Sequence, residues 1–122
     1  MSSARAFAIG EANLFPNDKV LALRWNGTSW RSIPAQDLAA PNDLTSESVF
    51  APRTGWAVGS TGGDTTLIEQ LTRSGWTAVA TPPISGTASL ASISTLSDRV
   101  AWAVGASTPP SGQSQTLVEV IC

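Results

Sequence analysis

A tetrapeptide of alternating large and small residues occurs three times in this chain, once as Phe-Ala-Ile-Gly and twice as Trp-Ala-Val-Gly. Its first and last positions are Phe7 and Gly10, Trp56 and Gly59, and Trp102 and Gly105. Successive copies begin 49 and 46 residues apart. A self-similar unit of this length, built from short apolar segments and turn residues, is typical of repeat folds such as β-propeller blades. The repeat therefore constrains the architecture but identifies no ligand.

A second segment repeats in step with the tetrapeptide, at residues 21–25, 67–71 and 117–121. In the first two copies a short turn and a tryptophan follow it, Trp30 and Trp76. The first turn contains Asn26-Gly27, the strongest short hairpin signal, because both central residues of a type I′ turn need positive φ. We therefore expect segment 21–25 to pair with segment 30–33 as antiparallel strands.

Each unit is predicted to contain four strands, because a further segment precedes the tetrapeptide at residues 46–50 and 88–96, and the tryptophan strands cover 30–33 and 76–80. Four antiparallel strands per unit match one propeller blade. Alternation supports this prediction, since the large residues of Trp-Ala-Val-Gly fall on one face of a strand and the small ones on the other. No helix is expected, because the one candidate, residues 35–40, lies between two prolines and forms at most a single turn.

The sequence thus predicts an all-β chain of β-propeller-type repeats, with about two and a half to three four-stranded antiparallel blades. We expect one repeat domain over residues 1–122, divided into a partial blade (1–40), a full blade (41–86) and a partial blade (87–122). Segments 11–18 and 107–115 differ between copies and contain Phe-Pro and Pro-Pro. They are expected to be loops on one rim, where ligand specificity would lie.

The repeated residues resemble a family of bacterial tandem repeats in which Val-Trp-Ala-Val-Gly precedes Thr-Leu-Ile-Glu-His-Trp-Asn-Gly-Thr-Ser-Trp, and which is associated with β-propeller-like proteins. The resemblance covers almost the whole chain and is best at residues 100–105, 65–69 and 25–30. Phe7 replaces the first tryptophan, histidine is absent throughout, and the third copy stops before its turn. The resemblance implies a fold more than an activity, because propellers host unrelated functions.

The phase of the repeat implies incomplete blades. The chain starts in a tetrapeptide strand and ends in a 117–121 strand, which predicts three, four and three strands in the three units. A propeller closes with about 4 to 8 blades, and uncovered sheet faces and edges of this kind are seldom tolerated. We expect a homo-oligomer, most simply a dimer of about six blades, because the apolar last strand would otherwise be an exposed edge. The alternative is a ring completed by another blade-supplying chain.

Composition excludes several classes of function. Charged residues make up 13% of the chain, the net charge is −2, and no basic run is present, so a nucleic-acid partner is not expected. No apolar run reaches the roughly 18–20 residues of a membrane span, and no signal peptide is recognisable. The abundance of serine and threonine favours a secreted or cell-surface protein, with the cytoplasm as the alternative. Cys122 is the single cysteine, so no internal disulfide is predicted.

Catalytic chemistry is not predicted. The chain has no histidine, no tyrosine and one terminal cysteine, which excludes Ser-His-Asp and Cys-His sites and the usual zinc sites. Glu69 and Glu119 occupy equivalent positions and are interpreted as a solvated or hydrogen-bonded feature of the blade. Asp64 and Asp98 lie in turn sequence, where aspartate ordinarily caps its own backbone. We therefore predict no enzyme, no cofactor and no metal.

Tryptophan is the most informative residue type, with five in 122 residues. Trp56 and Trp102 are expected to pack within and between blades. The other three flank hairpins, where partly exposed rings could stack on the apolar face of a sugar, and the first hairpin loosely resembles the Trp-Asp-Gly-x-x-Trp hairpin of small fucose-binding propeller lectins. The candidate glycan-binding residues are Arg24, Trp25, Trp30, Glu69 and Trp76. Two functions stay open: a non-catalytic assembly or protein-interaction module that self-associates, and a carbohydrate-binding lectin.

Overall fold

The chain folds into strands connected by turns. A computed structural model describes residues 5–12, 19–36, 42–62 and 64–122. Within these ranges it contains ten strands: β1 (Ala6–Ala12), β2 (Lys19–Trp25), β3 (Trp30–Ser32), β4 (Asn42–Ala51), β5 (Thr54–Thr61), β6 (Thr65–Thr72), β7 (Gly75–Val79), β8 (Thr87–Thr95), β9 (Ala101–Thr108) and β10 (Gln115–Ile121). The all-β prediction is confirmed. No helix long and apolar enough to cross a membrane occurs in the described ranges.

The strands form three small antiparallel sheets, which we call A, B and C in chain order. Sheet A has the order β1-β2-β3, sheet B the order β4-β5-β6-β7, and sheet C the order β10-β9-β8. The predicted division into three, four and three strands is confirmed for this part of the chain. The described residues form open sheets and no closed ring, so the propeller interpretation remains a prediction.

The same register recurs in every sheet. The tetrapeptide glycine lies opposite the first residue of the second repeated segment in all three: Gly10 opposite Leu21, Gly59 opposite Leu67, and Gly105 opposite Leu117. One residue of slip would turn each side chain to the other face of its sheet. The internal alignment read from the sequence is therefore the structural alignment.

Some strand boundaries differ from the prediction. β4 begins at Asn42, four residues before the predicted segment 46–50, because a bulge after Leu44 lets the strand continue along β5 to Thr61. β3 stops at Ser32 and β7 runs from Gly75 to Val79, each within a residue of its expected end. The candidate helical turn at 35–40 and the expected loop at 11–18 lie largely outside the described residues.

The β2–β3 hairpin is present, but its turn is not type I′. Trp25 pairs with Trp30, so the loop holds four residues. The N–H of Asn26 donates to the Ser29 carbonyl at 3.2 Å, and the Asn26 Oδ1 accepts two backbone N–H groups of the loop at 2.9 Å. Gly27 alone in this loop has positive φ (100°), whereas type I′ requires two such residues. The predicted turn type is wrong because the asparagine side chain closes the loop instead.

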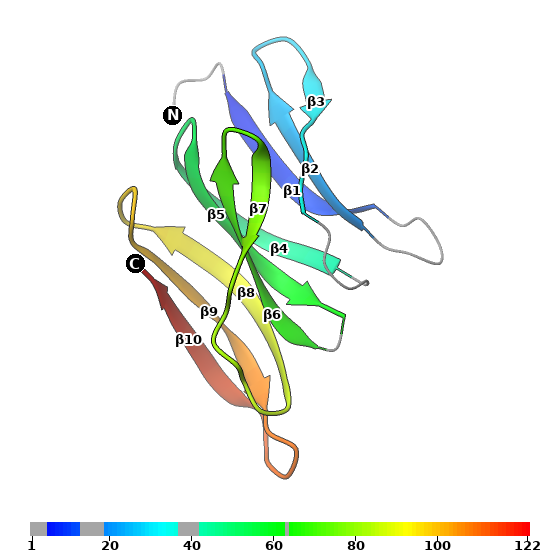
Figure 1. The fold of residues 1–122 in the computed structure, drawn as a ribbon, viewed down its shortest axis with the longest axis vertical. Coiled ribbons are helices and arrows are strands. Elements are labelled where there is room, and N and C mark those ends of the chain that lie inside the picture. The colour runs from blue at the N-terminus through cyan, green and yellow to red at the C-terminus, as the bar shows by residue number, and fades with distance from the viewer. Residues whose placement is uncertain (1–4, 13–18, 37–41, 63) are drawn as a thin grey trace.

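Sheet B lies between sheets A and C, and the three sheets pack face to face (Figure 1). The core has two parts, one in each interface. The part between sheets B and C contains Trp56, Val58, Ile68, Leu90, Ile93, Ala101 and Ala103. The part between sheets A and B contains Ala22, Leu44, Ala57, Leu67, Leu71 and Trp76, with Phe7 and Ile9 packed against it.

Both interfaces are built in the same way. Each sheet has a large face, which carries the first and third tetrapeptide residues, and a small face, which carries the alanine and glycine. The large face of sheet A packs on the small face of sheet B, and the large face of sheet B packs on the small face of sheet C. The predicted role of alternation, with small residues admitting a neighbouring sheet, is confirmed at Ala57 and Ala103, both fully buried.

Polar side chains of β4 also join sheets B and C. The Ser46 hydroxyl accepts the Ile93 N–H at 3.3 Å, and the Ser48 hydroxyl accepts the Thr95 N–H at 3.0 Å. The Thr45 hydroxyl lies within hydrogen-bond distance of two carbonyls, that of Leu90 at 2.7 Å and that of Val58 at 3.1 Å. These bonds fix β8 against β4 in one register.

Candidate functional site

The most unusual surface of the molecule is the large face of sheet C. Trp102, Val104 and Val118 hold the positions that Trp56, Val58 and Ile68 hold in sheet B. The sheet B residues are 6%, 0% and 4% exposed, whereas their sheet C counterparts are 46%, 43% and 51% exposed. Val120 on the same face is 48% exposed. Neighbouring apolar side chains of this size usually mark an interaction surface.

Hydroxyl groups line the same face in the pattern used inside the molecule. Ser92 and Ser94 lie opposite Val104 and Trp102, as Ser46 and Ser48 lie opposite Val58 and Trp56. In sheet B these hydroxyls accept N–H groups from the next sheet, while Ser92 and Ser94 are exposed to solvent. The large face of sheet C therefore repeats both the apolar and the polar part of a covered interface.

The small face of sheet A is the second face that no described sheet covers. By the alternation of β1 and β2 it carries Ala8, Gly10, Leu21, Leu23 and Trp25, all half-buried. A Cβ built at Gly10 meets no atom of the described residues within 4 Å, whereas one built at Gly59 runs into the β4 backbone at Asp43. In sheets B and C the tetrapeptide glycine is crossed by β4 and β8, respectively. The described residues of sheet A contain no equivalent strand.

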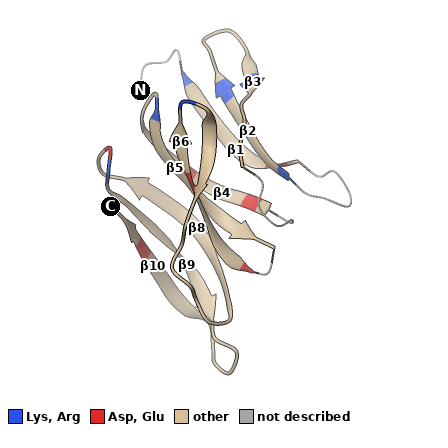
Figure 2. Cartoon of the chain, in the orientation of Figure 1, with Lys and Arg blue, Asp and Glu red and all other residues tan. Residues whose placement is uncertain are grey.

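The two uncovered faces differ in charge, because Lys19, opposite Ala12, lies on the small face of sheet A. Figure 2 shows Lys and Arg on sheet A and on hairpin tips, whereas sheet C carries Glu119 and the Asp98–Arg99 pair of its β8–β9 turn. Glu119 points to the small face and is 9% exposed. The large face of sheet C is consequently uncharged, and covering it would desolvate no ion.

Three glutamates lie at the internal sheet interfaces. Glu69 is fully buried and Glu119 nearly so, so the solvated alternative is wrong for both residues. The hydrogen-bonded alternative agrees with Glu119, which is bonded by the Thr66 hydroxyl. Burial raises the pKa of Glu119, against which the Thr66 hydroxyl acts in part. Burial also raises the pKa of Glu47, on β4, to about 7. Desolvation disfavours the ionised carboxylate in each case.

The five candidate glycan-binding residues do not meet in one site. Trp76 is 2% exposed and Glu69 is 0% exposed, because both side chains lie in the interface between sheets A and B. The expectation of a partly exposed ring at Trp76 is wrong. Arg24 lies on the large face of sheet A, since it pairs with Phe7, while Trp25 and Trp30 share the small face.

Trp25 and Trp30 do form an aromatic pair. Their ring centroids are 5.6 Å apart with a tilt of 52°, and Trp30 is 48% exposed. They form a cross-strand pair beside the four-residue turn of the β2–β3 hairpin. This pair is the part of the predicted sugar platform that the structure brings together.

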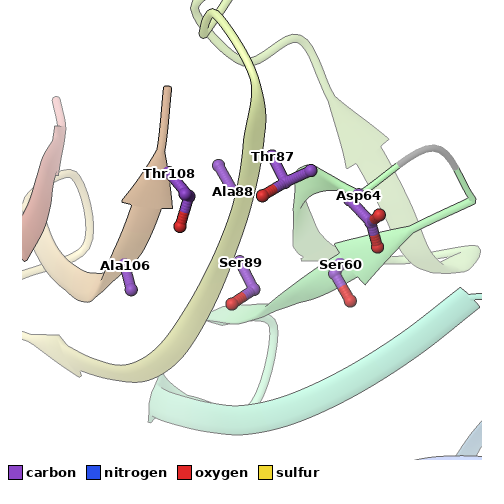
Figure 3. A pocket seen from close by; sticks show the side chains of 7 residues that line it. All are labelled: Ser60, Asp64, Thr87, Ala88, Ser89, Ala106 and Thr108. Carbon is purple, nitrogen blue, oxygen red and sulfur yellow. The ribbon is translucent and has the colours of Figure 1, made fainter. Parts of the chain in front are cut away.

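A polar pocket of about 270 Å³ lies where the β5–β6 turn meets β8 and β9. Figure 3 shows Ser60 and Asp64 on the sheet B side and Thr108 on β9, with Thr87 and Ser89 of β8 between them. Asp64 has φ 56° and its carbonyl accepts the Ala88 N–H at 2.6 Å. The turn role predicted for Asp64 agrees with this backbone geometry.

Sequence reasoning did not single out Val104, Val118 or Val120 as surface residues. Their alternation in β9 and β10 matches that of the buried copy, so the pattern alone assigns them to a core. The signal that distinguishes them is their place in the last unit, after which the described chain supplies no further sheet to cover them.

Comparison of the chain with protein-family models, with curated proteins and with solved structures gave no match.

Proposed function

We propose that this chain is a non-catalytic assembly module in which sheet C of one copy packs on sheet A of another. The observation that carries the proposal is the exposure of Trp102 and Val104, whose counterparts Trp56 and Val58 are covered by the next sheet. The four side chains that are each about half exposed are Trp102, Val104, Val118 and Val120. Covering each of them contributes about 1 kcal/mol to the free energy of association. That gain must exceed the free-energy cost of association.

The two uncovered faces are of complementary kinds. Every interface inside the chain joins a large face to a small face, and the remaining faces are the large face of sheet C and the small face of sheet A. Leu23 on sheet A stands where Glu69 and Glu119 stand in the other sheets, so this small face presents an apolar residue. Such an interface is head-to-tail, and two copies related by a twofold axis would close six sheets into a ring.

The test is the mass of the chain in solution. Light scattering on a sizing column should give twice the chain mass of 12.6 kDa. Val104→Lys should reduce this to the monomer, because a lysine ammonium would be buried in the contact. Leu96→Lys is the matched control, since Leu96 lies in the β8–β9 turn and is 63% exposed. A monomer for the unsubstituted chain at high micromolar concentration would contradict the proposal.

A second candidate function rests on the Trp25–Trp30 pair. An exposed indole beside a second ring can stack on the apolar face of a sugar, which favours a lectin limited to this hairpin. Titration with simple sugars should then change the tryptophan fluorescence saturably, and Trp30→Ala should abolish the change. Because Trp25 lies on the small face of sheet A, a bound sugar would compete with the packing of sheet C of another copy on this face. Sugar binding should then lower the mass measured in solution. No saturable signal with any simple sugar would rule this candidate out.

A further inference from the structure

β7 fills a slot between two other segments of the chain. On one side it pairs with β6, with Trp76 opposite Leu71. On its other side it meets the segment that follows β3: the Trp76 N–H donates to the Pro34 carbonyl at 2.9 Å, and the Gln36 N–H donates to the Trp76 carbonyl at 3.1 Å. Ala35 and Trp76 form an isolated parallel bridge at this point.

The side chain of Trp76 anchors the strand in this slot. Its ring is 2% exposed and belongs to the same cluster as Ala22 and Leu71, with Ile33 packed against it. Phe7 meets the ring edge-to-face, with centroids 6.4 Å apart and planes at 84°. Such an aromatic pair contributes about 0.5–1.5 kcal/mol beyond the area that it buries.

A second slot of the same construction lies between sheets B and C. It is a groove of about 450 Å³ lined by Ile68, Val79, Ala80, Pro82 and residues 118–122. The internal repeat places Ile68 where Ala22 lies in the filled slot, and Val79 and Ala80 where Ile33 and Pro34 lie. β10 is the edge strand of sheet C, so in the described part of the chain no strand pairs with its outer edge. Val79 is correspondingly 37% exposed.

We infer that this groove is a binding site for an extended peptide strand that carries a tryptophan, of the type Gly-Trp-Thr-Ala-Val found in β7. The strand pairs antiparallel with β10, its tryptophan opposite Ile121, and the tryptophan N–H donates to the Ala80 carbonyl. Addition of a strand to a sheet edge supplies main-chain hydrogen bonds, and a side-chain pocket supplies specificity. Pro82 has no N–H to match the donor of Gln36, so this slot offers one main-chain bond fewer.

The inference does not depend on the proposed stacking of sheets, because the groove lies at the edge of sheet C. The test therefore uses the Val104→Lys chain as well as the unsubstituted chain, since Val104 does not line the groove. A labelled peptide with the sequence of residues 73–81 should show a saturable rise in fluorescence anisotropy with both chains. If the chain proves to be a monomer because sheet C does not pack on sheet A, the anisotropy of the labelled peptide should still rise.

Two substitutions test the anchor and its pocket. A peptide carrying Trp76→Ala should bind at least about tenfold more weakly, because a buried indole is a typical binding hot spot. Val79→Asp in the protein should weaken binding of the unsubstituted peptide to a similar extent. Leu96→Lys should leave it unchanged, because Leu96 does not line the groove. The inference is overturned if the peptide does not bind, or if the Trp76→Ala peptide binds equally well.

Two introduced cysteines test the register. Val120 of β10 holds the position of Gln70, which pairs with Thr77. With the chain that carries Val120→Cys and Cys122→Ser, a peptide carrying Thr77→Cys would place two cysteines directly across a strand pair, where Cα atoms are about 4.5–5.5 Å apart and a disulfide can form. In a glutathione redox buffer this peptide should cross-link, whereas one carrying Val79→Cys, displaced by two residues, should not. Equal cross-linking of both peptides would contradict the register.

Discussion

At the scale of single residues, the tetrapeptide glycine has one role in sheets B and C and another in sheet A. At Gly59 and Gly105 a bulged neighbouring strand crosses so closely that an added Cβ would meet backbone: Leu44 Cα lies 2.9 Å and Leu90 Cα 2.8 Å from it, and carbonyl oxygens lie closer still. At Gly10 the same atom would meet none of the described residues within 4 Å. The repeat thus conceals two structural roles behind one sequence pattern.

Alanine substitutions should separate these roles. Gly59→Ala and Gly105→Ala should each lower the free energy of unfolding by on the order of 2 kcal/mol, because backbone atoms must move to admit the methyl group. Gly10→Ala should be neutral or slightly stabilising, since a methyl group there meets open space and restricts the unfolded chain. Urea denaturation of the three variants checks this. Equal effects at all three positions would show that the glycines share one role.

Glu47 makes the stability depend on pH. Its pKa is raised from 4.5 to about 7, so between these values the folded state binds more protons than the unfolded state. The free energy of unfolding therefore falls as the pH rises from about 4.5 to 7 and stays low above it. Burial of Glu119 acts in the same direction.

Glu47→Gln should therefore stabilise the chain at pH 8 and change little at pH 4. The gain at pH 8 is on the order of 1 kcal/mol, a figure discounted because the carboxyl is only partly buried and is screened by solvent. Glu11→Gln, at an exposed position of β1, supplies the matched control. Urea midpoints at both pH values make the comparison, and a gain for Glu47→Gln that is equal at both would contradict the assignment.

At the scale of elements, the bulge of β4 joins two sheets. The bulge leaves Thr45 without a partner residue on β5, and its hydroxyl reaches the carbonyls of Leu90 and Val58 at 2.7 and 3.1 Å. Sheet C has Ala91 at the equivalent bulge, which can make no such bond. The extra residue of β4 thus becomes a link between sheets B and C.

Thr45→Val keeps the shape of the side chain and removes the hydroxyl. We expect a loss of about 1 kcal/mol in the free energy of unfolding, the usual net value of such a bond. Thr45→Ser retains the donor and should lose clearly less. Both are measured by chemical denaturation under the same conditions. If the valine and serine variants were equally stable, the hydroxyl would have no part in joining the sheets.

The elements themselves could be predicted from the sequence, because alternation with period two and the repeated glycine define strand, face and register together. Burial could not be predicted in the same way: Trp56 and Trp102 belong to identical tetrapeptides but are 6% and 46% exposed. The exposure of each tryptophan depends on whether another sheet packs on its face. The tetrapeptide sequence carries no information about that. The five candidate glycan-binding residues do not meet in one site for the same reason, since a hairpin tryptophan is buried at Trp76 and exposed at Trp30.

At the scale of the whole molecule, the stack of sheets has a direction. Sheet B lies in the middle of the stack, between sheets A and C (Figure 1). The contacts of sheet B leave the large face of sheet C at one end of the stack and the small face of sheet A at the other. A head-to-tail contact joins sheet C of one copy to sheet A of another, whereas the alternative contact joins the same face of both copies. These two modes of association predict different behaviour when chains defective in opposite faces are mixed.

Val104→Lys damages the large face of sheet C, and Leu23→Lys damages the small face of sheet A. In head-to-tail association each variant alone should be monomeric, because a two-membered ring then lacks both of its interfaces. Mixed in equal amounts, they should form a complex of one chain of each kind, since one intact face remains on each partner. This complex should dissociate more readily than the unsubstituted dimer, which holds two interfaces. Light scattering of each variant and of the mixture, with circular dichroism to verify folding, decides between the modes: a Leu23→Lys chain that still dimerises alone would show that sheet C packs on itself.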